Sequence, residues 1–248
     1  MRLRSITKNV KKQNWFAVLL DFLIVVLGVF IGVQIGNINE NRADKHDYYA
    51  ALERFKVEAK TNLTTLDKLD SESSNYLKRG SEAFDILLSC HDNPENLEIF
   101  NSGLGVIGGT YGIRIHRSAL DELTHSEKLL AKQSVELRQR FADAKYYIDL
   151  ALYEARFVEM IPLEERMQNN PIIGIGTTVS GKSTYAGADF SRKQRQLKLK
   201  VPISEACKND ALVKSFYTWE RWQNVLPALS KILRSQTEKT LDMLNQTI

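Results

Sequence analysis

The chain has 248 residues, of which 43% are hydrophobic and 26% are charged, so it is long enough to bury a core of ordinary globular composition. Its net charge of +4 comes from five basic residues in the tail 1–14, and the other 234 residues sum to −1, with 29 basic against 30 acidic side chains. Because the excess positive charge is confined to one short tail, this balance argues against nucleic-acid binding.

Residues 15–35 are the most apolar segment, WFAVLLDFLIVVLGVFIGVQI, with one charge at Asp21 and one further polar residue at Gln34. A helix of about 21 residues spans roughly 31 Å, enough to cross a hydrocarbon core of roughly 30 Å. A core helix of a soluble protein is rarely apolar on every side over this length. A cleaved signal sequence has a shorter apolar stretch and a small-residue cleavage site. We therefore expect a transmembrane helix at 15–36 that stays attached to the protein.

The basic tail 1–14 predicts how this helix is oriented. Arg2, Arg4, Lys8, Lys11 and Lys12 directly precede the apolar segment, with no acidic residue among them. Basic residues beside a membrane helix are retained on the cytoplasmic side. We expect a cytoplasmic tail, a single crossing of a bacterial inner membrane, and a periplasmic C-terminal domain.

One face of the predicted membrane helix carries small residues and the single charge. Glycines on one face let another helix approach closely, and an aspartate in hydrocarbon costs roughly 2.5–3.5 kcal/mol unless a partner or a wet crevice offsets it. We expect this face to contact lipid and another membrane protein or a second copy of the chain, although glycine is also simply common in membrane helices. The residues of this predicted packing face are Ala17, Asp21, Val25, Gly28, Gly32 and Gly36.

The rest of the chain predicts a mainly α-helical protein. Between Gly36 and Gly80 there is neither glycine nor proline, and apolar residues recur every three or four positions, which predicts a helical stalk at 37–79 that continues the membrane helix. Residues 80–248 then form one helical domain, with a small β-hairpin or irregular insertion near 170–203. The expected pieces are a helix at 81–89, a short helix from 94 toward 100, a glycine-rich loop or irregular strand at 103–112, helices at 117–127 and 132–167, and a helix at 209–245 kinked at Pro227.

The chain has two cysteines, Cys90 and Cys207. Thiols in the periplasm are oxidised, and a bridge between these two would close a loop worth on the order of 4–5 kcal/mol on the chain-entropy model. The sequence leaves open whether the two form a disulfide or remain two unpaired buried cysteines.

A phosphate-binding motif is matched by the segment from Gly176 through Gly181 and Lys182 to Ser183. Such a loop must open an amphipathic helix, whereas the following TYAGADFSRKQRQ has a glycine in its first turns and no apolar stripe. No later strand ends in an aspartate that would hold magnesium, and the predicted compartment lacks ATP. A glycine-rich hairpin turn that matches by chance explains the segment better.

Metal-binding and acid–base candidates are isolated. Glu122 and His125 share a helix face, but a di-iron bundle needs that pair twice with two further glutamates. His46, His91 and His116 have no partner at a ligand spacing. We expect no catalytic residue, cofactor or metal, and hence no enzyme.

The segment NWFAVLLDFLIVVLGVFIGVQIGNINENR resembles the N-terminal signature of an uncharacterised bacterial family, a domain of unknown function. The matching residues are Asp21, Gly28, Gly32, Gln34, Asn37, Asn39, Glu40 and Arg42. A looser similarity covers the segment from Arg117 to Leu129, followed by Glu136 to Arg138, with Ser126-Glu127 where the family usually has Ser-Gly. The resemblance implies one N-terminal membrane helix and a helical extramembrane domain, and it implies no activity.

Three functions fit these observations to different degrees. The first is a non-enzymatic scaffold or accessory subunit of an inner-membrane assembly, docked through the glycine face. The second is a periplasmic ligand-binding or sensory domain, which would need a signalling partner because a tail of about 14 residues cannot hold an output domain. A nucleotide hydrolase using Lys182 is the remote third.

Overall fold

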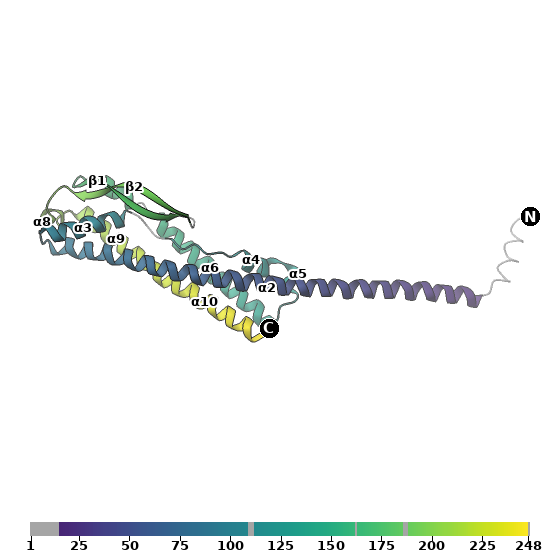
Figure 1. Ribbon diagram of the computed structural model, residues 1–248. Coiled ribbons are helices and arrows are strands. Elements are labelled where there is room, and N and C mark those ends of the chain that lie inside the picture. The colour runs from purple at the N-terminus through teal and green to yellow at the C-terminus, as the bar shows by residue number, and fades with distance from the viewer. Residues whose placement is uncertain (1–14, 109–111, 162, 186–187, 248) are drawn as a thin grey trace, which may run out of the picture.

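The computed structural model describes residues 15–108, 112–161, 163–185 and 188–247, with side chains except those of residues 15, 17, 18, 163–165, 182–185, 188–190, 192 and 247. The predicted basic tail 1–14 lies outside the described residues. The molecule is elongated, with one long helix projecting from a helical bundle (Figure 1). It is mainly α-helical with one two-stranded antiparallel sheet, as predicted.

The long helix, α2, runs without a break over 75 residues from Trp15 to Ser89. It is the one helix of the described chain that is long and apolar enough to cross a membrane, and its apolar end is not buried against any other part of the protein. The asparagines at 37, 39 and 41 lie inside the regular helix. The predicted stalk is therefore the first part of the central bundle helix, which ends nine residues beyond Gly80 rather than at it.

The bundle has two hydrophobic cores along α2. The first, nearer the projecting end, forms where α4 (Ser118–His125), α5 (Glu127–Leu130), α6 (Val135–Glu159) and α10 (Val225–Thr247) pack on α2. Phe55 of α2 meets Phe141 of α6 edge-on, with ring centroids 5.4 Å apart. The buried residues of this core include Leu52, Phe55, Leu66, Leu120, Leu123, Phe141, Ile148, Leu233 and Leu244.

The second core lies at the far end of α2. It combines α2 with α3 (Pro94–Ile107), α8 (Ile203–Ala206), α9 (Asp210–Gln223) and the base of the sheet, with α7 (Leu163–Gln168) beside α9. Its buried aromatic residues are Phe84, Phe100, Phe216 and Trp219. The sheet pairs β1 (Ile173–Tyr185) with β2 (Ala188–Leu199), and Ile173 and Leu199 are the buried pair at its base.

Residues 103–107 of the glycine-rich segment were predicted incorrectly as a loop or irregular strand, whereas Gly108 and Gly112 lie outside α3 and residues 109–111 lie outside the described residues. Gly103 and Gly105 are inside α3, which begins after Asn93, whose side chain accepts a 2.7 Å hydrogen bond from the amide of Asn96. A Cβ atom added to Gly103 would lie 2.2 Å from the Cβ of Ala83, so glycine lets α3 approach α2 closely. Close packing of the two helices outweighs the low helix propensity of glycine.

Other boundaries also differ from the predictions. The helix expected at 132–167 is divided into α6 and α7, and the kink expected at Pro227 is a helix break at Asn224. Pro227 then lies in the first turn of α10, where its missing N–H leaves no hydrogen bond unmade. The hairpin is confirmed, with strands longer than expected and an irregularity between Ile175 and Thr178.

Candidate functional site: the free side of the long helix

The predicted packing face lies at the apolar end of α2 and is free in the single chain. A Cβ atom added to Gly28, Gly32 or Gly36 would have no atom within 4 Å beyond the adjacent backbone of α2, and Asp21 and Val25 are exposed. Ala17 belongs to the same helix, but its side chain lies outside the described residues. The fold therefore leaves these backbone surfaces open to a second helix.

Beyond the apolar segment, a groove of about 760 Å³ runs beside α2 where α4 packs against it. Ala50, Val57 and Thr61 of α2 line one side, and His116 and Ala119 line the other. Val57 is 65% exposed, although it is a large apolar residue. The groove thus presents apolar and small side chains to an open surface.

Three acidic side chains, Glu53, Glu58 and Glu122, and one basic side chain, Arg54, also line the groove. Arg54 and Glu122 form a two-pronged ion pair, with Nη2 2.6 Å from Oε1 and Nε 3.2 Å from Oε2. Lys56, outside the lining, pairs with Glu53 at 2.9 Å, so the charges of the lining residues sum to −2 and those of the lining together with Lys56 to −1.

Glu58 holds the wall of the groove in place by capping α4. Its carboxylate accepts hydrogen bonds from the amides of Ala119 at 2.9 Å and Leu120 at 3.2 Å, and from the Ser118 hydroxyl at 3.0 Å. Arg117, the residue at the N-cap position of α4, provides no side-chain cap. A carboxylate at a helix N-terminus satisfies free amides and interacts favourably with the helix dipole.

Asn62 fixes the segment that precedes α4. Its side chain is buried; it donates to the His116 carbonyl at 2.6 Å and accepts from the His116 amide at 2.8 Å. On the other side of α4, Lys145 of α6 bonds Asp121 at 2.7 Å and Asp149 at 3.0 Å. The hydrogen bond with Asp121, more than that with Asp149, raises the pKa of Lys145 above its ordinary value. These contacts make the groove wall a defined part of the fold.

The residues considered as metal ligands make separate contacts and do not converge on one point. Glu122 pairs with Arg54, whereas His125 Nδ1 lies 2.7 Å from the Asp121 carbonyl. His46 is exposed on α2 and His91 follows its end, far along the chain from His116 in the groove. Among the described residues, no group of three His, Cys, Asp or Glu side chains is arranged to hold a metal ion.

The segment with the phosphate-binding spacing is neither a loop before a helix nor the hairpin turn that we expected. Residues 176–183 lie within β1, and Gly181 pairs with Arg192 across the sheet. A phosphate-binding loop needs consecutive free amides at a helix N-terminus, and β1 is followed by β2. The side chains of Lys182 and Ser183 lie outside the described residues.

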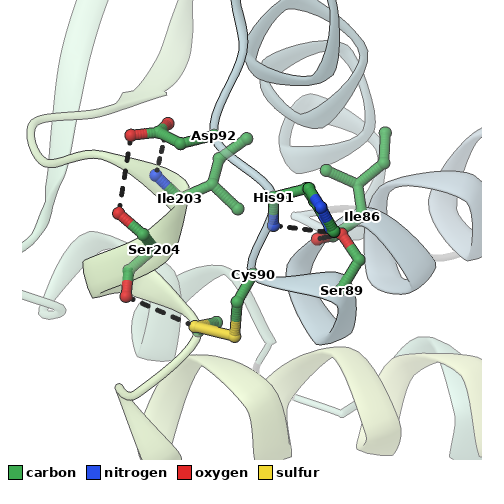
Figure 2. The surroundings of a disulfide bond; sticks show 8 residues. Ile86, Ser89, Cys90, His91, Asp92, Ile203 and Ser204 are labelled. Carbon is green, nitrogen blue, oxygen red and sulfur yellow. Dashed lines mark hydrogen bonds between the residues drawn. A yellow bond between two sulfur atoms is a disulfide. The ribbon is translucent and has the colours of Figure 1, made fainter.

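The two cysteines, at the far end of α2, are joined by a disulfide with Cα atoms 5.5 Å apart. Figure 2 shows Cys90 directly after α2 and the neighbouring Asp92, which accepts a 3.1 Å hydrogen bond from the amide of Ile203. Among the described non-glycine residues, Cys90 alone has a positive φ, at 53°. Glycine is the usual residue for a left-handed helix terminus, so a cysteine in this place is explained by the bond it makes.

The sequence analysis missed two surfaces. The groove depends on Glu58, Asn62 and His116 meeting across more than 50 residues of chain, which no local pattern shows. The second surface is a stripe of exposed apolar residues, and it could have been predicted because these residues recur every three or four positions along α6, offset from the buried stripe. Its members are Tyr146, Leu150, Tyr153, Phe157 and Met160.

Comparison with known proteins identifies no relative: no family model, curated protein or solved structure matches the chain. The resemblance to an uncharacterised bacterial family therefore stays a prediction. The function has to be inferred from the chain's own residues.

Proposed function

We propose that the protein is a non-enzymatic accessory subunit of an assembly in a bacterial inner membrane. Its tail 1–14 is cytoplasmic, α2 crosses the lipid once, and the bundle stands in the periplasm. The face containing Asp21, Gly28, Gly32 and Gly36 packs against a membrane helix of another subunit, so that the bundle is held at a fixed place beside it.

The observation that carries this proposal is the continuity of α2. The segment 19–35 has no protein contact to bury it, with large apolar side chains that are 45–63% exposed. Such a surface needs lipid or another protein around it. Because the same helix continues without a break through both bundle cores, whatever binds the membrane segment also sets the position and rotation of the bundle.

The disulfide supports the periplasmic placement. Disulfides persist in oxidising compartments and are rare in the cytoplasm. The Cys90–Cys207 bond ties the end of α2 to the segment between α8 and α9, so an oxidised bundle is a more constrained one. This agrees with the orientation that the basic tail predicts.

Leucine substitutions on the glycine face test the docking. Gly28→Leu with Gly32→Leu places side chains where another helix backbone would lie, so the protein should leave its complex in a mild detergent. Val26→Leu with Val33→Leu adds bulk in the same segment on another face and should have no effect. The measurement is the native size of the solubilised protein. Unchanged size of the glycine variant would refute docking through this face.

A further inference from the structure

The unbroken α2 lets one side of the helix be followed out of the membrane segment. At about 100° per residue, Gly28, Gly32 and Gly36 point in one mean direction, and the bundle-facing residues Tyr48 and Phe55 point about 150° away from it. The buried positions on α2 confirm which side faces the bundle: Tyr48, Leu52, Phe55, Ala59 and Leu66. The glycine side therefore continues along the outer surface of α2.

This outer side continues over about 25 residues of helix, or roughly 38 Å at the α-helical rise, and its charged residues Glu53 and Arg54 lie at the groove. We call it the outer ridge. It is exposed or half-buried throughout, whereas charged residues such as Lys45, Lys56 and Lys60 lie on other sides of α2. The uncharged residues of the outer ridge are Asn39, Ala43, His46, Ala50, Val57, Thr61 and Thr64.

The groove beside α4 lies along this ridge, since Ala50, Val57 and Thr61 belong to both. Together with Glu53, which lies between Ala50 and Val57, the ridge residues recur in steps of three and four, which is the spacing of a seam between two nearly parallel helices. A helix that packs on Gly28 and Gly32 in lipid and continues straight out of the membrane therefore meets the outer ridge and then the groove.

The charge of this side indicates what kind of helix fits. Asp21 lies on the glycine face, and the groove lining holds Glu53, Glu58 and Glu122 against Arg54, while Lys56 pairs with Glu53 from outside the lining. A parallel second copy would bring Asp21 against Asp21 in lipid and one acidic groove against another. Like charges in apposition destabilise an interface, whereas basic residues on the incoming helix would complement it.

We propose that the groove binds the extramembrane continuation of the same helix that docks on the glycine face, and that this helix belongs to a different membrane protein with basic residues level with the groove. This inference rests on the proposed function, because it names the partner's chemistry and extends its contact beyond the membrane. The partner then contacts α2 at two levels, in lipid at Gly32 and outside the membrane at Val57.

Site-specific photocrosslinking in native membranes tests the proposal with the full-length protein. A benzoylphenylalanine replaces Val25 at the membrane height, and Ala50 or Val57 at the groove height, with Lys45 and Tyr49 as exposed control positions on other sides of α2. We expect an adduct of one mass from all three test positions and none from the controls. Gly32→Leu should lower the yield about fivefold at both heights, as a loss of roughly 1 kcal/mol in affinity would.

A charge reversal completes the test. Glu53→Lys should lower the yield at Val57 by about fivefold and leave Val25 unaffected, and Lys60→Glu should change neither. An adduct from Val25 alone would overturn this inference and leave the proposed function standing, whereas no adduct at any test position would overturn both. An adduct of twice the chain's own mass would show a second copy in the groove and overturn the proposal of a different partner.

Discussion

Cys90 and Cys207 join two segments that are 117 residues apart, fastening the end of α2 to the α8–α9 segment with Cα atoms 5.5 Å apart. Asp92, two residues beyond the first cysteine, accepts a hydrogen bond from the amide of Ile203 at the start of α8 (Figure 2). The second hydrophobic core is thus closed by the Cys90–Cys207 disulfide and, next to it, by the hydrogen bond that Asp92 accepts from the start of α8.

Breaking this bond should destabilise the bundle. The double variant Cys90→Ser with Cys207→Ser should lose on the order of 4–5 kcal/mol by the loop-entropy relation, seen as a lower midpoint of thermal or urea unfolding. Reductant should lower the midpoint of the wild type and leave that of the double variant unchanged. Two reactive thiols per chain in the folded, unreduced protein would contradict the bond.

The two glycines of α3 should respond in opposite ways to alanine. Gly103→Ala places a Cβ 2.2 Å from that of Ala83 and 2.7 Å from the Arg79 carbonyl oxygen, and should cost about 1–3 kcal/mol. Gly105→Ala meets no atom within 4 Å and should be neutral or stabilise by up to about 1 kcal/mol, because alanine has the higher helix propensity. Equal effects in urea unfolding would show that α3 does not approach α2 as described.

The sequence was sufficient where one local property decides the outcome. The apolar helical segment 15–35, the stripe of α2 that includes Leu52 and Leu66 and the helix start at 94 could be predicted because composition, helical period and helix-start signals act within a few residues. These three features cover the projecting rod, the central helix and the start of α3.

The sequence was insufficient where contacts between distant segments decide. Gly80 and Gly103 are typical helix breakers, and they are helical here because Trp219 and Ala83 fill the space that a side chain would occupy. The groove could not be predicted because it exists only where two distant segments, α4 and α2, meet. Glu58 looks like an ordinary surface charge until the α4 amides are placed beside it.

Removing the Glu58 cap should destabilise the first turn of α4. Glu58→Ala removes three hydrogen bonds to the start of α4 and should cost about 1–2 kcal/mol, whereas Glu53→Ala, at the exposed rim, should stay within about 0.5 kcal/mol of the wild type. Hydrogen exchange should show faster opening of the amides of 118–121 in Glu58→Ala only. Equal protection in both variants would contradict the capping role.

The Lys145 contacts should stabilise the fold up to a high pH. Because the pKa of Lys145 is raised in the folded state, its contribution is complete below the unfolded value of about 10.4 and is lost as the pH rises through the higher folded value. The difference in unfolding free energy between wild type and Lys145→Gln should be constant from about pH 7 to 9 and shrink once the pH rises above the unfolded pKa of lysine.

Lys214→Gln provides the control, since Lys214 and Asp210 form a largely exposed pair. That variant should unfold with nearly the same free energy as the wild type over the whole range. A wild-type advantage over Lys145→Gln that persisted undiminished above the folded pKa would show that the charge of Lys145 is not what stabilises the contact between α4 and α6.

The side of the membrane on which the bundle stands is the most direct test of the account. Alkaline phosphatase, which folds only under oxidising conditions, and a cytoplasm-dependent fluorescent protein are each fused after Ile248 in the full-length chain and expressed in bacteria. Phosphatase activity without fluorescence is the result that the basic tail, the exposed apolar helix and the Cys90–Cys207 bond predict. Fluorescence without phosphatase activity would place the bundle in the cytoplasm and contradict the proposed periplasmic subunit.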